Sequence, residues 1–164
     1  MKRTVIIVAG GKGLRMGGGL PKQFVPLLGK PVLMHTLEVF YGWDAGADLL
    51  LVIPEDQASY WAMLCRELNC IVPHRIVYGG DTRFDSVKNG LKATTTGEGI
   101  IAVHDGVRPF VSPDVISSCF AAAGAFGAAI PVVPVIESVR ERKGYESRPF
   151  DRNRLCIVQT PQVF

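Results

Sequence analysis

The chain has 164 residues, of which 48% are hydrophobic and 20% charged, with 18 glycines and 11 prolines. This composition excludes a disordered or collagen-like chain, and the length suffices for a buried core, so we predict a single domain over residues 1–164. The formal net charge of +3, from 18 basic and 15 acidic side chains, indicates no particular partner by itself.

Short apolar runs rich in valine and isoleucine alternate with longer amphipathic stretches along most of the chain. This alternation is typical of βαβ units, in which helices cover both faces of a mainly parallel sheet. The sequence therefore predicts the α/β class. We expect strands at residues 4–9, 48–53, 75–78, 100–104 and 128–133.

Helix start signals precede the amphipathic stretches. Pro31 suits a first helical turn, Glu55 favours the positive end of a helix dipole, and Asp81 and Ser112 carry oxygens that can cap free N–H groups. We expect helices over residues 32–41, 55–68, 82–91 and 112–123.

The pattern changes after Pro134. Residues 135–142 and 155–160 are predicted as two extended segments joined by a polar stretch that contains glycine and proline, and residues 140–154 hold six basic side chains. We interpret this region, over about residues 136–158, as a protruding hairpin arm. A two-stranded ribbon is only marginally stable alone, so we expect the arm to pack on a second subunit.

The cysteines and apolar runs bear on the compartment. The four cysteines form no C-x-x-C pair and the three histidines are scattered, which argues against a zinc site or a disulfide framework and for a reducing cytoplasm. The apolar run at residues 4–9 is too short to cross a membrane, and the one at 120–136 is interrupted by prolines. We expect a cytoplasmic protein with neither a membrane nor a nucleic acid as partner.

Positive charge is concentrated at two places. Residues 1–37 hold six basic and no acidic side chains, residues 38–139 hold six basic and twelve acidic ones, and residues 140–154 hold six basic and three acidic ones. Two cationic blocks around an acidic middle are expected of a protein that binds a small polyanion.

A glycine-rich loop, A-G-G-K-G-L-R-M-G-G-G-L-P-K-Q at residues 9–23, follows the first predicted strand. Glycines let backbone N–H groups approach a phosphate chain, and Lys12, Arg15 and Lys22 add positive charge. An ordinary connecting loop has no reason to collect three cations without an acid. The loop lacks the G-K-[ST] of a Walker A motif, and Met16 stands where a dinucleotide fingerprint needs its third glycine.

Two further polar clusters follow predicted strands: G-G-D-T-R-F-D-S at residues 79–86 and H-D-G-V-R-P-F at residues 104–110. In a parallel sheet, both lie at the carboxyl edge together with the glycine-rich loop. Asp105 and Arg108 could form only a local ion pair, but their place beyond a buried strand favours a binding role. His104 is expected to be a packed residue rather than a catalyst.

These blocks, together with D-R-N at residues 151–153 and Q-T-P-Q at residues 159–162, resemble the 2-C-methyl-D-erythritol 4-phosphate cytidylyltransferase family over essentially the whole chain. The sister ribitol-5-phosphate cytidylyltransferases are similar in the first blocks, and D-R-N favours the methylerythritol enzymes. The resemblance implies a three-layer α/β/α Rossmann-like nucleotidyltransferase fold. It also implies transfer of CMP from CTP to the substrate phosphate in isoprenoid precursor biosynthesis, with release of pyrophosphate.

The resemblance implies roles for individual residues. Arg15 and Lys22 would stabilise charge on the triphosphate, and Arg152 would position the substrate phosphate from the other subunit of a homodimer. The nucleotide would contact Ala9, Gly10, Gly11, Gly13, Gly80, Asp81 and Ser86. The polyol phosphate would contact Asp105, Arg108, Ser138 and Thr160. Mg²⁺ is expected as cofactor, held mainly by the triphosphate, with no metal ligand assigned.

Two departures from the family pattern are visible. Ser138 replaces a common threonine but keeps the hydroxyl, and family members continue beyond the counterpart of Phe164. We therefore expect the C-terminal part of the family's domain to be missing, and a nucleotide-binding module without catalysis is an alternative. A nicotinamide-dependent oxidoreductase is disfavoured by the glycine spacing.

Overall fold

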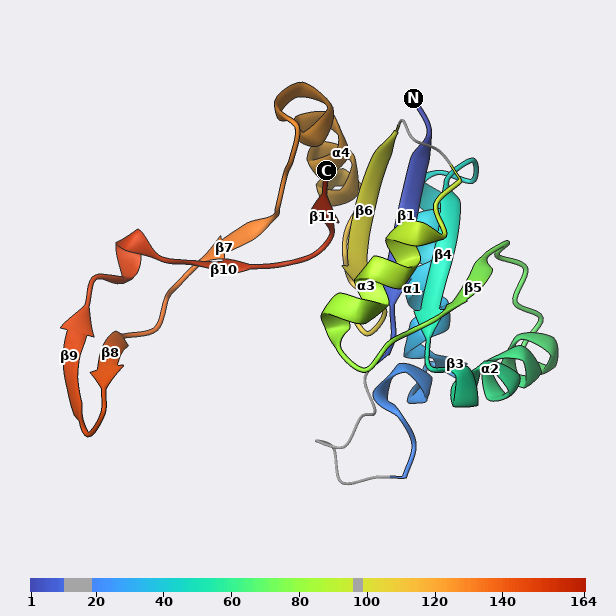
Figure 1. Cartoon of the computed structure of the whole chain (residues 1–164), viewed down its shortest axis with the longest axis horizontal. Coiled ribbons are helices and arrows are strands. Elements are labelled where there is room, and N and C mark those ends of the chain that lie inside the picture. Colours follow the sequence, from blue (N-terminus) through green and yellow to red (C-terminus); the bar gives the residue numbers. More distant parts are fainter. Residues whose placement is uncertain (11–18, 96–98) are drawn as a thin grey trace.

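A five-stranded sheet in the order β11-β6-β1-β4-β5 forms the centre of the computed structural model, which describes residues 1–10, 19–95 and 99–164 (Figure 1). The sheet strands are parallel except β11, which is antiparallel to β6. Their bounds are β1 Arg3–Val8, β4 Asp48–Ile53, β5 Arg75–Tyr78, β6 Ile100–Asp105 and β11 Gln162–Val163. The three strands at the centre are nearly continuous apolar runs because both of their faces are covered.

Four helices cover the two faces of the sheet: α1 Val32–Trp43, α2 Glu55–Glu67, α3 Arg83–Lys92 and α4 Pro113–Phe126. Side chains of α1, α2 and α4 share one core with Val5 and Ile7 of β1. On the opposite face, Val87 and Leu91 of α3 pack against a smaller core that includes Ile6. The predicted three-layer α/β/α arrangement is thus confirmed, and among the described residues α3 is the helix of the second face.

Capping residues set the starts of α3 and α4. The Ser112 hydroxyl accepts a hydrogen bond from the backbone N–H of Val115, as the sequence predicts for the start of α4. The prediction that Asp81 caps α3 is wrong. Thr82 is the cap, because its hydroxyl stands three residues before Asp85 and accepts from the Asp85 N–H at 3.1 Å.

Four of the five predicted strands are found in the sheet, whereas the strand predicted at residues 128–133 is wrong. Within it, Ala129 forms an isolated bridge to Val163 of β11, and residues 132 and 133 belong to β7, which lies outside this sheet. Pro131 and Pro134 lack the N–H groups that a sheet strand must donate. The place beside β6 is taken by β11, and the chain leaves the sheet as β7 (Val132–Pro134).

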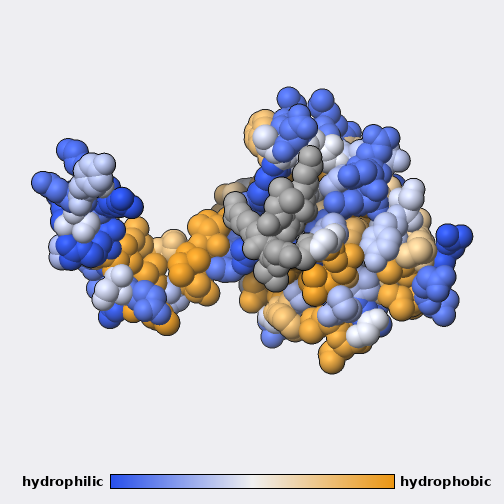
Figure 2. Space-filling model, turned by 90° about the horizontal axis from the view of Figure 1, so that it is seen from below, coloured by the Kyte–Doolittle hydropathy of each residue, from blue (hydrophilic) through white to orange (hydrophobic). Residues whose placement is uncertain are grey.

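The segment between β7 and β11 forms an arm that projects away from the sheet (Figures 1 and 2). Its stem pairs β7 with β10 (Cys156–Val158), and its tip pairs β8 (Val139–Lys143) with β9 (Glu146–Phe150). The polar stretch that we expected to join two long strands therefore forms a hairpin of its own. At the neck of the arm, the Gln159 N–H donates to the Pro131 carbonyl at 2.9 Å.

The remaining elements are short: η2 Lys22–Phe24, β2 Pro26–Leu27, β3 Lys30–Pro31 and η3 Arg152–Arg154. None of the helices in the described part of the chain combines the length and apolar character that crossing a bilayer requires.

Candidate functional site

The strand order reverses between β1 and β6, and we use the term crevice for the carboxyl edge of the sheet at this reversal. From β1 the chain moves outward to β4 and β5, then returns to the other side of β1 as β6. Ligands of open α/β sheets bind at such a reversal of strand order. Val8 is in register with Asp105 there, and the Gly106 N–H donates to the Val8 carbonyl at 2.8 Å. The loops after β1 and β6 therefore meet.

On one side of the crevice, Ser86 of α3 brings the predicted nucleotide-binding loops together. Its side chain is buried, and its hydroxyl accepts from the Gly80 N–H at 3.1 Å. A Cβ atom on Gly79 would lie 2.9 Å from that hydroxyl oxygen, and one on Gly10 would lie 3.2 Å from it. Glycine at these positions lets the loops after β1 and β5 pack against one serine.

Asp81 differs from these neighbours. It is exposed, and its side chain makes no hydrogen bond with the part of the chain that the structure describes. Ala9, by contrast, is buried, and its N–H donates to the Val52 carbonyl at 2.8 Å. Arg15, Gly11 and Gly13 lie outside the described residues.

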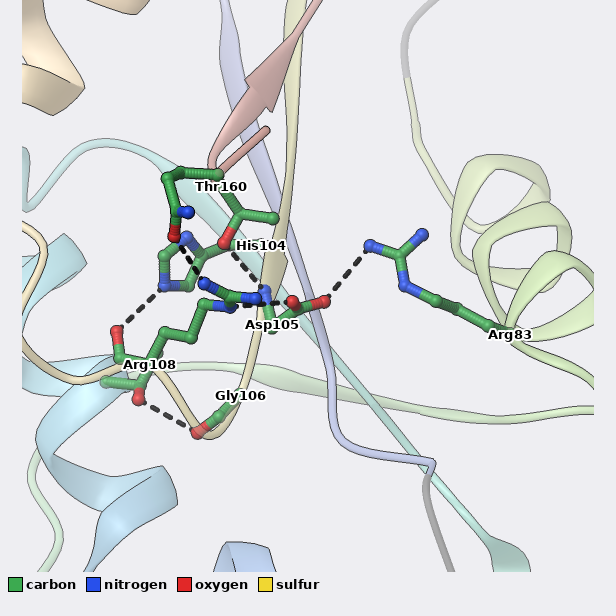
Figure 3. A network of polar contacts seen from close by, with 8 residues as sticks. Arg83, His104, Asp105, Gly106, Arg108 and Thr160 are labelled. Carbon is green, nitrogen blue, oxygen red and sulfur yellow. Dashed lines mark hydrogen bonds and ion pairs between the residues drawn. The ribbon is translucent and has the colours of Figure 1, made fainter. Parts of the chain in front are cut away.

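On the other side, Asp105 at the end of β6 is the centre of a polar network (Figure 3). Its carboxylate accepts from Arg83 at 3.0 Å and from Arg108 at 2.9 Å. Arg108 also donates to the side chain of Gln159 at 2.6 Å, and the Asp105 N–H donates to the Thr160 hydroxyl at 3.4 Å. One carboxylate between two guanidinium groups leaves net positive charge at this edge, which suits an anionic ligand.

His104 supports this network from within the core. It is fully buried, and its Nε2 lies 3.0 Å from the Arg108 carbonyl oxygen. A carbonyl only accepts, so Nε2 carries the proton and Nδ1, which has no partner among the described residues, carries none. Burial lowers the pKa of His104, so the neutral ring persists at neutral pH. His104 is therefore a packed residue that holds the Arg108 loop, as expected.

Lys22 is half-buried on η2, the short turn at the end of the glycine-rich loop. The next residue, Gln23, is buried and donates from Nε2 to the Ala9 carbonyl at 2.9 Å. This bond ties the turn that carries Lys22 to the end of β1.

The two predicted arm residues lie apart from the crevice of their own chain. Ser138 is exposed between β7 and β8, and Arg152 on η3 donates to the carbonyl of Ile136 at 2.5 Å. The arm that carries both projects away from the sheet (Figure 1).

Sequence reasoning assigned no role to several residues that join the site. Arg83 and Gln159 lie inside the motif blocks, so their shared place at the carboxyl edge is a usable signal. Thr36 donates to the Gly106 carbonyl at 2.9 Å, and Gln57 accepts from Gln23 at 2.6 Å. Both belong to helices without a motif, and nothing in the sequence marks them.

Metal-ligating groups are sparse in the crevice. Residues 1–10, 19–95 and 99–164 contain no cluster of three or more histidine, cysteine or carboxylate side chains. Asp105 is engaged by two arginines.

Comparison with known sequences gives a consistent result. The sequence model of the family described as IspD, 2-C-methyl-D-erythritol 4-phosphate cytidylyltransferase, matches residues 3–164. Curated proteins named 2-C-methyl-D-erythritol 4-phosphate cytidylyltransferase from Phocaeicola vulgatus and Bacteroides thetaiotaomicron are 55% and 53% identical over 164 residues. Each alignment covers 100% of this chain and 74% of the relative.

Solved structures agree with the sequence relatives. A crystal structure named 4-diphosphocytidyl-2C-methyl-D-erythritol synthase from Anaerococcus prevotii matches with a TM-score of 0.83 and 28% identity, covering 99% of this chain and 69% of that one. The 2-C-methyl-D-erythritol 4-phosphate cytidylyltransferase of Thermus thermophilus matches with a TM-score of 0.74 and 30% identity, covering 100% and 70%.

Proposed function

The chain belongs to the 2-C-methyl-D-erythritol 4-phosphate cytidylyltransferase family, and on this premise we propose that it transfers CMP from CTP to the phosphate of 2-C-methyl-D-erythritol 4-phosphate. The observation that carries the proposal is the crevice between β1 and β6. The glycine loops around Ser86 lie on one side of it, and the Asp105 network with its net positive charge lies on the other. Two anionic substrates thus have adjacent places at one edge.

The reaction needs positioning more than proton transfer. An oxygen of the substrate phosphate, already anionic at neutral pH, forms a bond to the α-phosphorus of CTP. The bond from that phosphorus to the β-phosphate oxygen breaks, and pyrophosphate leaves with the electron pair. No side chain has to be activated as a nucleophile, so the chain's task is in-line placement and neutralisation of developing charge.

Lys22 and Arg15 are assigned to this neutralisation, at the triphosphate. Lys22 is supported by its place on the turn that Gln23 ties to the end of β1. Loss of one such charge costs roughly 100- to 1,000-fold in kcat. Lys22→Ala should show this loss, measured as pyrophosphate release. Lys30→Ala is the matched control, because Lys30 pairs with Glu38 at 2.6 Å and should keep the parent rate.

Mg²⁺ is assigned to the nucleotide substrate, bound by phosphate oxygens, where it shields the negative charge of the triphosphate. Gly10, Gly80, Asp81 and Ser86 are assigned to the nucleotide, and Asp105, Arg108 and Thr160 to the polyol phosphate. Because the substrates are small phosphorylated metabolites and the four cysteines are free, the cytoplasm is the proposed compartment.

The arm is assigned to the interface of a homodimer. Its stem exposes apolar side chains that its own chain leaves uncovered, including Val133 at 43% and Ile157 at 48% exposure. A second copy would bury this strip. Its arm would also bring Ser138 and Arg152 to the crevice of the first copy.

The decisive assay supplies the purified protein with CTP, Mg²⁺ and either methylerythritol phosphate or ribitol 5-phosphate. Pyrophosphate release with the first acceptor and much slower release with the second is the expected result. Tight CTP binding without turnover on either acceptor would contradict the proposal and favour a nucleotide-binding module. Equal rates on both acceptors would contradict the substrate assignment.

Mixed dimers test the assignment of Arg152. Arg152→Ala and Lys22→Ala should each be nearly inactive alone, because each breaks a different half of every site. After subunit exchange, an equal mixture should recover roughly a quarter of the parent activity, since half of the dimers then hold one intact site. No recovery would show that each site is built within one chain. Arg148→Ala, on the same arm, is the control that should stay active.

A further inference from the structure

Gln23 is a buried polar side chain beside a proposed catalytic residue. It is 2% exposed and stands on η2, directly between Lys22 and Phe24. Buried amides are costly unless they are hydrogen-bonded, so the partners of Gln23 reveal what the burial achieves.

Both protons of the Gln23 amide are committed. Nε2 donates to the Ala9 carbonyl at 2.9 Å and to the Gln57 side-chain oxygen at 2.6 Å. A backbone carbonyl can only accept, so the NH₂ group and not the oxygen must face Ala9. The same orientation requires an acceptor at Gln57. The end of β1, η2 and α2 are thus joined at one nitrogen atom.

Helix α2 holds η2 at a second point. The Phe24 ring stacks on that of Trp61 with centroids 6.3 Å apart, and it meets the ring of Tyr60 edge-on at 5.1 Å. Trp61 is fully buried and lies one helical turn after Gln57, so both anchors stand on the same face of α2. The turn that carries Lys22 is therefore fixed at two points, by the hydrogen bond from Gln23 to Ala9 and by the packing of Phe24 on α2.

We propose that Gln23 is a positioning residue for cytidylyl transfer, held in orientation by Gln57. By tying η2 to the end of β1, it sets where Lys22 stands relative to the phosphates that bind beyond Ala9. This inference rests on the proposed role of Lys22. Gln57, on a helix without any motif, acts on the site through its contact with Gln23.

Three variants test the proposal. Gln23→Met keeps the size of the side chain but removes both donors, and kcat should fall about 10- to 100-fold, the cost of a small misplacement of a catalytic group. KM for both substrates should stay within about threefold, because the substrate contacts themselves are unchanged. Gln57→Leu should lower kcat in the same way but less, whereas Gln57→Glu retains an acceptor for Gln23 and should restore nearly the parent rate.

A double-variant cycle separates positioning from general destabilisation. If Gln23 acts through Lys22, Gln23→Met should cause little further loss in a Lys22→Ala background. Circular dichroism and thermal unfolding confirm that each variant is folded. If Gln23→Met does not fold, Gln57→Leu, at a half-buried position, replaces it as the test variant.

The outcomes distinguish the two proposals. An unchanged kcat in folded Gln23→Met, equal rates for Gln57→Leu and Gln57→Glu, or a full additional loss in the Lys22→Ala background would overturn the positioning role and leave the proposed function intact. An unimpaired Lys22→Ala would overturn the role of Lys22 and the positioning role together. A parent protein without turnover would overturn the proposed function itself.

Discussion

The sheet and the arm obtain their stability in different ways. In the sheet, apolar residues are enclosed by their own chain: Phe40 of α1 is fully buried. In the arm, Ile157 of β10 is 48% exposed, and no residue of its four strands is buried. The side chains of the sheet and its helices thus pack against one another, whereas the apolar side chains of the arm stay exposed. The proposed site draws on both, so in the proposed dimer its full assembly would depend on a second copy.

The largest expected effect comes from removing a buried side chain from the core that packs against the sheet. Phe40→Ala leaves a cavity at the place where the Phe40 ring of α1 packs edge-on against the His104 ring. The two ring centroids are 4.8 Å apart. The free energy of unfolding should fall by about 3–5 kcal/mol. Urea denaturation followed by circular dichroism measures it, and a loss below 1 kcal/mol would contradict the picture of an enclosed core.

The arm side should respond in association rather than in folding. Ile157→Asp places a charge on the apolar stem and should weaken dimerisation by about 2–3 kcal/mol, the scale of a strong interface residue. Light scattering across a dilution series measures this change. Phe126→Asp is the matched control, because Phe126 is 86% exposed at the end of α4, outside the arm. Equal dimerisation by the Ile157→Asp variant and the parent would place the interface elsewhere.

The same contrast explains what the sequence predicts well. The strands Asp48–Ile53 and Arg75–Tyr78 are found where expected, because short β-branched runs between helices leave few alternatives. The edge of the sheet was not predictable in this way. Val163 exchanges two hydrogen bonds with Ala129, so this edge is decided by contacts between segments far apart in the chain rather than by local pattern.

The candidate site follows a similar division. Asp105 and Arg108 could be grouped beforehand, because parallel strands bring their following loops to one edge. Gln57 and Thr36 could not, since they reach the site from helices across 34 and 70 residues of sequence. The arm was expected as one long hairpin, but its tip closes at Gly144, whose φ of +61° suits a tight turn.

A change of pH should alter the free energy of unfolding through a residue of the sheet, His104, rather than through the arm. His104 has a lowered pKa in the folded protein, so below about pH 6.5 the unfolded chain takes up a proton that the folded chain refuses. The free energy of unfolding should therefore fall as pH falls from about 6.5, by up to about 1.4 kcal/mol per pH unit, and level off below the folded pKa.

His104→Gln should lose this part of the pH dependence. The other two histidines are common to both proteins, so the difference between their stability profiles isolates His104. Identical slopes between pH 5 and pH 6.5 would contradict a buried neutral ring.

The smallest expected effect lies at the arm tip. Arg148 and Glu141 form an exposed ion pair across β8 and β9, with 78% and 46% of their side chains accessible. Such pairs contribute about 0–0.5 kcal/mol. Arg148→Ala should leave the unfolding midpoint unchanged within error, at low and at high salt. A clear loss would mean that the tip contributes to the stability of the sheet.

At the neck of the arm, the residues where the chain leaves the sheet and where it returns are hydrogen-bonded to each other. Because Gln159 bonds to Pro131 where the chain departs and returns, the segment between them can change in length and composition at little cost in chain entropy to the rest of the molecule. Replacing it by a short glycine linker would join two ends that are already neighbours. The proposed dimer arm can therefore vary in length without disturbing the sheet, while Ser138 and Arg152 tie its sequence to the proposed site.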